Sequence, residues 1–123
     1  MKKIFLVLIL ICFSFFIACN KTDFKGTRIA ESYIYQLDIE KMNGTDTHKM
    51  NLDANDILNI HFKTTLGKIN LSIIAPDGST FYSGNGLNLT LFKLNIKEKG
   101  EYTIVVKAKN AKGNIKINLI EEK

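Results

Sequence analysis

The sequence predicts an all-β fold, an antiparallel β-sandwich of about seven or eight short strands that follows an N-terminal signal segment. Several segments after residue 32 alternate apolar and polar side chains with the period of two that a half-buried strand requires. Turn-forming residues, chiefly Gly, Asn, Asp and Pro, interrupt these segments about every ten residues. No segment after Cys19 sustains the period of about 3.6 residues of an amphipathic helix, so helical bundles and doubly wound folds fit poorly.

The N-terminal segment has the organisation of a secretory signal. Lys2 and Lys3 give it a positive start, and residues 4–17 are apolar apart from Ser14. A helix that crosses a bilayer needs about 20 apolar residues, so this run is too short for a permanent span. An ordinary signal peptide and an uncleaved anchor are the alternatives to the lipidated form that the next residues favour.

The stretch Phe16-Ile17-Ala18-Cys19 closes the apolar run and resembles the lipobox of bacterial lipoproteins, with Phe16 in place of the usual leucine. The resemblance implies cleavage before Cys19, a diacylglyceryl thioether on its sulfur and acylation of its new amine. Several acyl chains on one residue give stable attachment without a spanning helix. Cys12 would leave with the signal, so no thiol would remain for a disulfide. The predicted organisation is a signal peptide at 1–18, lipidated Cys19 and a flexible tether at 19–32, and the sandwich at 33–123.

The predicted strands follow one another along residues 33–123. From Tyr33 to Glu40 the alternation is strict, and further strands are expected at 50–52, 58–63, 67–73, 80–83, 87–96, 102–108 and 115–119. Between 87 and 96 the apolar residues change parity, which predicts a β-bulge near Leu91–Lys93 or a strand that bends between two sheets. Turns are expected at 43–46, 53–56, 76–78, 84–86, 97–100 and, as a hairpin, 110–113.

Three stretches within residues 48–120 resemble the bacterial pre-peptidase C-terminal domain, a small jelly-roll β-sandwich. They are Asp56-Ile57-Leu58-Asn59-Ile60, the strand from Gly67 that ends in Pro76-Asp77-Gly78, and Gly100-Glu101-Tyr102 with the strand after it. The resemblance implies a jelly-roll-like fold and a non-catalytic role, because the family's domain usually accompanies secreted peptidases. The family's Asp-rich strand is here Asn70-Leu71-Ser72, which argues against an acidic ion site.

No metal or cofactor site is predicted. His48 and His61 are not at ligand spacing, and His61 falls on an outer face. Asp53, Asn55 and Asp56 offer oxygen atoms that suit calcium, but the EF-hand pattern fails and Asx residues at a strand-entry turn explain them.

The sequence does not predict an enzyme. Its serines lie outside any nucleophile-elbow context, and its acids are scattered over turns and outward strand positions. A glycan surface remains open: Phe81 and Tyr82 are adjacent, so one of them would face outward on a strand. The candidate ligand-surface residues are Phe81, Tyr82, Asn85 and Asn88. A protein interface would arise if four outward apolar residues merged into a patch: Ile34, Ile74, Val105 and Ile120.

The balance of basic and acidic residues gives little indication of the class of partner. After residue 18 the chain has fifteen Lys and Arg residues against twelve Asp and Glu, and Arg28 is its only arginine. A nucleic-acid partner is not predicted, since the basic residues are spread evenly. The sequence therefore predicts a lipoprotein at the extracytoplasmic side of the cell membrane, with a binding or structural role towards an envelope protein or glycan. The alternative is a free-standing accessory domain that assists a secreted peptidase or glycan hydrolase.

Overall fold

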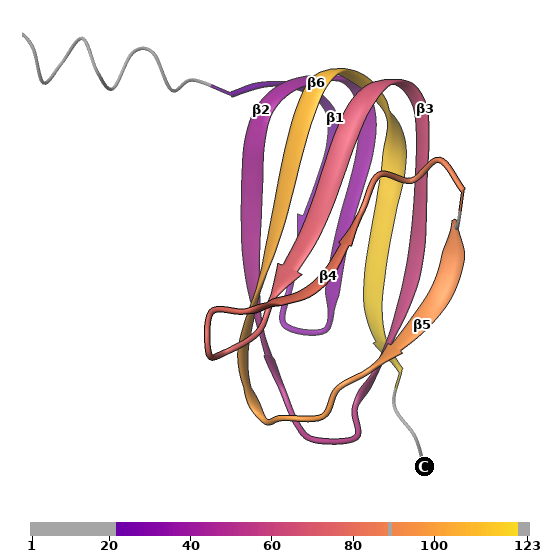
Figure 1. Cartoon of the computed structure of the whole chain (residues 1–123). Helices are drawn as coiled ribbons and strands as arrows, with labels where there is room; N and C mark the ends of the chain where they lie inside the picture. Colours follow the sequence, from indigo (N-terminus) through magenta and orange to yellow (C-terminus); the bar gives the residue numbers. More distant parts are fainter. Residues whose placement is uncertain (1–21, 89, 121–123) are drawn as a thin grey trace, which may run out of the picture.

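The computed structural model describes residues 22–88 and 90–120, and they form an antiparallel β structure (Figure 1). Within these residues there is no helix, and therefore none that could cross a membrane. The strand order is β1-β2-β6-β3-β4, and β5 pairs with β3 beside this path. The strands are β1 (Asp23–Ala30), β2 (Ile34–Leu52), β3 (Ile57–Ile74), β4 (Thr80–Gly84), β5 (Leu91–Asn95) and β6 (Gly100–Ile120). The predicted all-β class is confirmed.

The three long strands, β2, β3 and β6, bend near their middles, and the sheet thereby folds back over itself (Figure 1). The pairing registers shift at these points, at residues 39–44 of β2 and 64–68 of β3 opposite 108–113 of β6. Each long strand therefore contributes to two halves of the sheet. The first half holds β1, β5, residues 34–39 of β2, residues 57–64 of β3 and residues 113–120 of β6. The second half holds β4, residues 44–52 of β2, residues 68–74 of β3 and residues 100–108 of β6.

The prediction of seven or eight separate strands is not confirmed: the described residues form six strands, because the predicted turns at 43–46 and 110–113 and the predicted strand start at Gly67 are bends inside continuous strands. Gly44, Gly67 and Asn110 have positive φ angles of 124°, 69° and 46°, which let the backbone kink where the registers shift. Pairing resumes on both sides of each kink, so no hairpin forms at 110–113.

A single core lies between the two halves of the sheet. Alternate residues of the long strands face inward, as the period of two predicts, and Tyr35 and Tyr102 are among them. The buried apolar residues form one cluster, comprising Tyr35, Leu37, Ile39, Met42, Met50, Leu52, Leu58, Ile60, Phe62, Ile69, Leu71, Ile73, Ile96, Tyr102, Ile104, Val106, Ala111, Ile115 and Ile117. One contiguous core is what a single small domain requires.

The tether predicted at 19–32 is wrong for Asp23–Ala30, which forms strand β1 against β2. Seven of its eight residues are exposed, so the strand shows no alternation that sequence analysis could detect. Backbone hydrogen bonds to β2 hold it at the edge of the sheet instead. Residues 19–21 lie outside the described residues.

The change of parity between residues 87 and 96 has a different cause from the predicted bulge or bent strand. Strand β5 begins at Leu91 and pairs with β3 without a register shift, and residues 85–88 and 90 are not part of a strand. Two backbone hydrogen bonds tie this segment to β3, from the Thr64 amide to the Gly86 carbonyl at 3.0 Å and from the Phe62 amide to the Thr90 carbonyl at 2.8 Å. Leu87 and Leu91 are consequently exposed rather than buried.

The molecule has two unlike ends (Figure 1). We call residues 23–26, 40–45, 63–68 and 107–113, where the long strands bend and β1 begins, the bend end. We call the four connections at 31–33, 53–56, 75–79 and 96–99 the turn end. The N-terminal segment joins the fold at the bend end, because Asp23 pairs with Asn43.

Candidate functional site

A polar cluster, formed by Arg28, Tyr35, Asp46 and His48, closes one open flank of the folded sheet. Arg28 lies on β1, whereas Tyr35 and Asp46 lie on opposite sides of the bend in β2. The fold-over of β2 brings them together, so that the Tyr35 hydroxyl donates to an Asp46 carboxylate oxygen. The Arg28 Nε donates to both Asp46 oxygens, at 3.2 and 3.0 Å.

Aromatic stacking completes this flank cluster. The rings of Tyr35 and His48 stack with centroids 5.3 Å apart, and the Arg28 guanidinium lies 5.9 Å from the Tyr35 ring centroid. His48 Nε2 is 2.8 Å from the Glu31 carbonyl oxygen. Each polar group of the cluster thus has a partner, and the arrangement acts as a clamp between the two halves of the sheet.

The clamp leaves no activated nucleophile or base. Burial, followed by the hydrogen bond to Asp46, raises the pKa of Tyr35 far above its ordinary value of 10.0. The hydroxyl therefore stays protonated and neutral throughout the physiological range. Asp46 is already bound by both Tyr35 and Arg28. These groups hold one another rather than a substrate.

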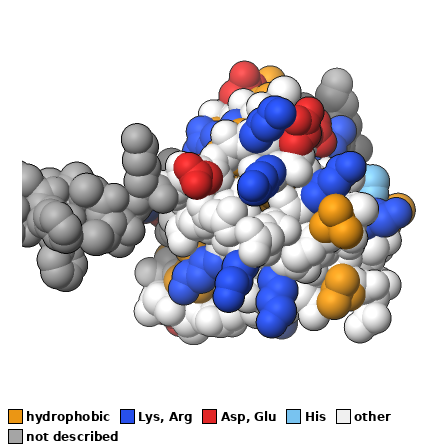
Figure 2. All heavy atoms as spheres, turned by 90° about the horizontal axis from the view of Figure 1, so that it is seen from above, with side chains coloured by type: hydrophobic (Ala, Val, Ile, Leu, Met, Phe, Trp, Pro, Cys, Tyr) orange, Lys and Arg blue, Asp and Glu red, His pale blue; other side chains and the backbone are white. Residues whose placement is uncertain are grey.

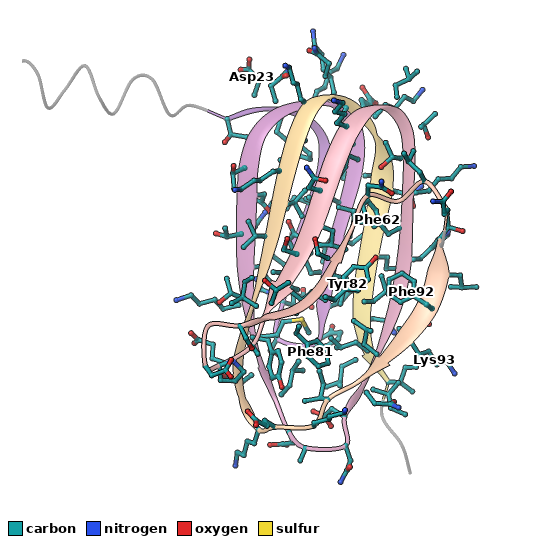
Figure 3. All side chains as sticks on the ribbon, in the orientation of Figure 1. Asp23, Phe62, Phe81, Tyr82, Phe92 and Lys93 are labelled. Carbon is teal, nitrogen blue, oxygen red and sulfur yellow. The ribbon has the colours of Figure 1, made fainter. Side chains whose placement is uncertain are left out.

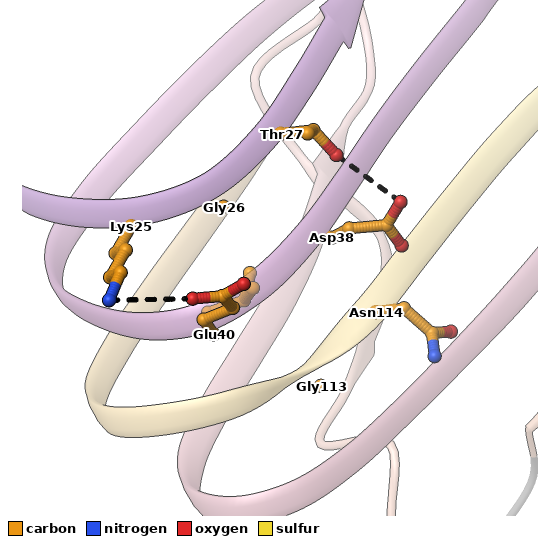
Figure 4. Close-up of a pocket in the computed structure, with 8 residues that line it drawn as sticks. Lys25, Gly26, Thr27, Asp38, Glu40, Gly113 and Asn114 are labelled. Atoms are coloured by element: carbon orange, nitrogen blue, oxygen red, sulfur yellow. Dashed lines mark hydrogen bonds and ion pairs between the residues drawn. The ribbon is translucent and has the colours of Figure 1, made fainter.

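A pocket of about 530 Å³ lies on the outer face, where β1 shifts its register on β2 (Figure 4). Two glycines, Gly26 and Gly113, line this pocket. A Cβ on Gly26 would lie 1.9 Å from the Asp38 carbonyl oxygen, and a Cβ on Gly113 would lie 2.3 Å from the Lys63 carbonyl oxygen. Close backbone approach at the bend, rather than the shape of a ligand, accounts for both glycines.

Two carboxylates line this pocket, but neither is poised for acid–base catalysis. Asp38 accepts a hydrogen bond from the Thr27 hydroxyl at 3.3 Å, and Glu40 lies 3.7 Å from the Lys25 ammonium (Figure 4). Both acidic residues are exposed, so water screens them and no apolar wall surrounds them. The pocket offers a polar surface and not an enclosed reaction site.

The predicted ligand-surface aromatics do not project into solvent. The register of β3 on β4 shifts so that Phe81 is an extra residue between Tyr82 and Thr80, which interrupts the expected alternation of faces. Both aromatics are half-buried against the core (Figure 3). Phe81 meets Tyr102 edge-on at 5.6 Å, and Tyr82 contacts Phe92 at 5.0 Å between ring centroids.

The predicted partners of these aromatics, Asn85 and Asn88, are exposed on the segment before β5. The Asn85 carbonyl accepts from the Thr64 hydroxyl at 2.7 Å, and its side-chain oxygen accepts from the Leu87 amide at 3.1 Å. Asn85 thus shapes the loop. The structure brings neither asparagine together with an exposed aromatic ring.

The four apolar residues expected on the outer faces, Ile34, Ile74, Val105 and Ile120, are all half-buried. The exposed large apolar residues are different ones: Phe24, Ile29, Tyr33, Leu66, Leu87 and Leu91. Sequence reasoning missed Leu87 and Leu91 because they alternate in step with a strand that does not form. Their exposed fractions are 62% and 64%, Leu87 lying before β5 and Leu91 at its first residue.

The metal candidates have structural roles. The Asp56 carboxylate accepts a hydrogen bond from the Asp53 amide at 2.7 Å and so stabilises its own turn, in which Asn55 has a positive φ of 73°. His61 is exposed on β3 and His48 belongs to the flank cluster. Among the described residues no three His, Cys, Asp or Glu side chains gather as metal ligands do. The lipidation candidate Cys19 lies outside those residues, three positions before Thr22.

Comparison with known proteins gives a likeness of fold. No family model matches the chain, and no curated protein matches it significantly. Among solved structures, a periplasmic inhibitor of g-type lysozyme from Aeromonas hydrophila superposes with a TM-score of 0.52 at 13% identity, over 76% of this chain and 93% of that one.

Two further matches have TM-scores below 0.5. One is a family GH115 4-O-methyl-α-glucuronidase, with a TM-score of 0.41 at 14% identity over 80% of this chain and 16% of that one. The other is TmCBM61 in complex with β-1,4-galactotriose, with a TM-score of 0.37 at 12% identity over 79% of this chain and 70% of that one.

Proposed function

We propose that this protein is an exported lipoprotein, anchored through Cys19, whose folded-over sheet is a non-catalytic domain that binds a protein of the cell envelope. The observation that carries the proposal is the start of β1 at Asp23, so close behind the lipobox-like stretch that the domain follows Cys19 almost directly. An anchor this near to the fold would hold the whole domain at the membrane surface.

The state of the polar groups supports a binding role rather than catalysis. The flank cluster satisfies its own hydrogen bonds, and the pocket acids are exposed and occupied by Thr27 and Lys25. A catalytic acid–base pair needs side chains that are not already engaged in hydrogen bonds or ion pairs, in a site that excludes water. Neither region of this chain offers that combination.

An ordered apolar segment supports a protein partner. Leu87 and Leu91 are exposed, yet backbone hydrogen bonds from Phe62 and Thr64 fix the segment that carries them. Backbone that is already held in place before binding loses less conformational entropy on association. The likeness in fold to a periplasmic lysozyme inhibitor supports the same class of partner.

The anchor is tested by the intact mass of protein extracted from the membrane fraction. The expected mass is that of residues 19–123 plus acyl chains, and it should be lost in Cys19→Ala. An uncleaved chain or a released, unlipidated chain would contradict the anchor.

The protein partner is tested with g-type lysozyme as the probe. We expect the chain to lower the rate of cell-wall lysis in a dose-dependent manner, and Leu87→Asp with Leu91→Asp to remove that effect. Tyr33→Asp, at a comparably exposed side chain outside the segment, is the matched control. A rate that rises would favour the accessory role instead, and an unchanged rate would exclude this partner.

A further inference from the structure

We infer that the bend end is a docking face for anionic lipid headgroups, which holds the domain upright with its turn end away from the membrane. The inference rests on the proposed lipidation of Cys19 and adds a second, electrostatic contact to it. It assigns a role to the lysines of the bend end, which the proposed protein-binding segment does not use.

Charge is divided unequally between the two ends. The bend end has seven lysines, namely Lys25, Lys41, Lys63, Lys68, Lys107, Lys109 and Lys112, against two acids, Asp23 and Glu40. The turn end has five acids, namely Glu31, Asp53, Asp56, Asp77 and Glu98, against two lysines, Lys97 and Lys99. Figure 2 looks down on the bend end and shows Lys and Arg side chains spread over it. The positive end therefore faces an anionic surface more favourably than the other.

Most lysines of the bend end have no acidic partner among the described residues. Lys25 is the one in an ion pair, with Glu40 at 3.7 Å. Lys68 and Lys109 stand directly opposite each other in the pairing of β3 with β6, and both are exposed. Like charges at such positions destabilise a sheet. Folding therefore does not explain this pair, whereas a phosphate-bearing surface would neutralise it.

Two exposed apolar residues accompany these lysines. Leu66 is 61% exposed at the bend of β3, and Phe24 is 38% exposed at the start of β1, where it pairs with Met42. Lysines mixed with apolar side chains are the composition of surfaces that lie at the headgroup boundary of a bilayer. Such a face can insert Leu66 while its lysines contact the phosphates.

The position of the anchor directs this face to the membrane. Cys19 is three residues before Thr22, a distance that an extended chain spans in at most about 11 Å. The Thr22 hydroxyl donates to the Thr45 carbonyl at 3.1 Å, which fixes the entry of the chain onto the bend end. A lipid attached at Cys19 thus brings the bend end close to the headgroups. Juxtamembrane lysines contribute about 1 kcal/mol each at an anionic surface.

The experiment reconstitutes the membrane-extracted protein into vesicles and labels its lysines by acetylation. Mass spectrometry then measures the extent of labelling at each lysine. The vesicles consist of phosphatidylcholine alone or of phosphatidylcholine with phosphatidylglycerol. In the anionic vesicles we expect labelling of Lys68, Lys109 and Lys112 to fall about fivefold, the factor that corresponds to about 1 kcal/mol. Labelling of Lys97 and Lys99 should not change, and high salt should restore the lost labelling.

Matched charge reversals test the assignment. Lys68→Glu with Lys109→Glu should abolish the protection of Lys112, whereas Lys97→Glu with Lys99→Glu, which changes the net charge equally, should leave it intact. Equal labelling in both vesicle types, on protein whose mass shows the acyl chains, overturns the docking face and leaves the lipoprotein proposal standing. A mass without acyl chains overturns the lipoprotein proposal itself and the anchored orientation with it.

Discussion

The two ends of the molecule use their charged residues in different ways. At the turn end, acids stabilise the turns in which they lie: Asp56 accepts the Asp53 amide, and Asp77 accepts both the amide and the hydroxyl of Ser79, at 2.9 and 2.6 Å. At the bend end, the exposed lysines Lys68 and Lys109 face each other instead. Local structure explains the charges of one end and not those of the other. A function is therefore best sought where the residue types exceed what folding requires.

The glycines of the two ends provide the strongest test of this difference. Gly67 in the bend has a φ of 69°, and a Cβ there would lie 2.1 Å from the Asn110 carbonyl oxygen. Gly78 in the turn has a φ of 90° and open space around it. We expect Gly67→Ala to lower the free energy of unfolding by roughly 2–5 kcal/mol, from backbone strain plus overpacking.

Gly78→Ala is the matched control, and its expected cost is about 1–2 kcal/mol, from backbone strain alone. Urea unfolding followed by circular dichroism measures both. Equal losses at the two positions would show that the bends are not the tightly constrained parts of the fold.

A second test removes the clamp that holds the two halves together on the flank. Tyr35→Phe deletes the hydroxyl that donates to Asp46, a hydrogen bond to a charged acceptor, and should lower the free energy of unfolding by about 1.5–3 kcal/mol. Tyr102→Phe is the control, because its hydroxyl donates to a neutral carbonyl, that of Glu98, at 2.7 Å. A smaller loss is expected there.

The effect of Tyr35 should depend on pH in one direction. Its pKa is raised above the value of 10.0 that applies in the unfolded chain, so the stabilising contribution is complete below pH 10. Above pH 10 the unfolded chain releases this proton while the folded chain keeps it, and the contribution declines. Unfolding measured between neutral pH and pH 11 should therefore show the wild type and Tyr35→Phe converging. A constant difference would indicate that the hydroxyl does not carry the raised pKa.

Sequence analysis located the core and most of the strands, but neither β1 nor the bends. The alternation from Tyr33 to Glu40 and the Pro76-Asp77-Gly78 turn are where they were predicted. At residues 43–46 and 110–113, however, turn-forming residues serve equally well for a hairpin and for a bulge inside one strand. Choosing between them requires the long-range pairing of three strands, which one segment does not contain.

The candidate sites were harder to predict for the same reason. Arg28 and Asp46 come together only because β2 folds over, so no local sequence pattern predicts their ion pair. A register shift between β3 and β4 interrupts the alternation of faces that was expected for Phe81 and Tyr82. The unequal division of lysines between the ends became visible only when the topology assigned each segment to an end.

The smallest expected effect concerns Lys68, which we expect to lower the stability of the fold while it strengthens membrane docking. Lys68→Glu replaces a repulsive cross-strand pair with an attractive one opposite Lys109, and we expect the free energy of unfolding to rise by about 0.2–1 kcal/mol at low salt. Lys93→Glu, an exposed lysine on β5 opposite the neutral Asn59, is the control and should change little. The gain should shrink at high salt, since the pair is exposed. A variant that folds more stably yet protects Lys112 less in anionic vesicles would show that Lys68 is retained for docking at the expense of stability. A loss of stability on charge reversal would instead make Lys68 part of the fold, and the contrast between the two ends would no longer hold at this pair.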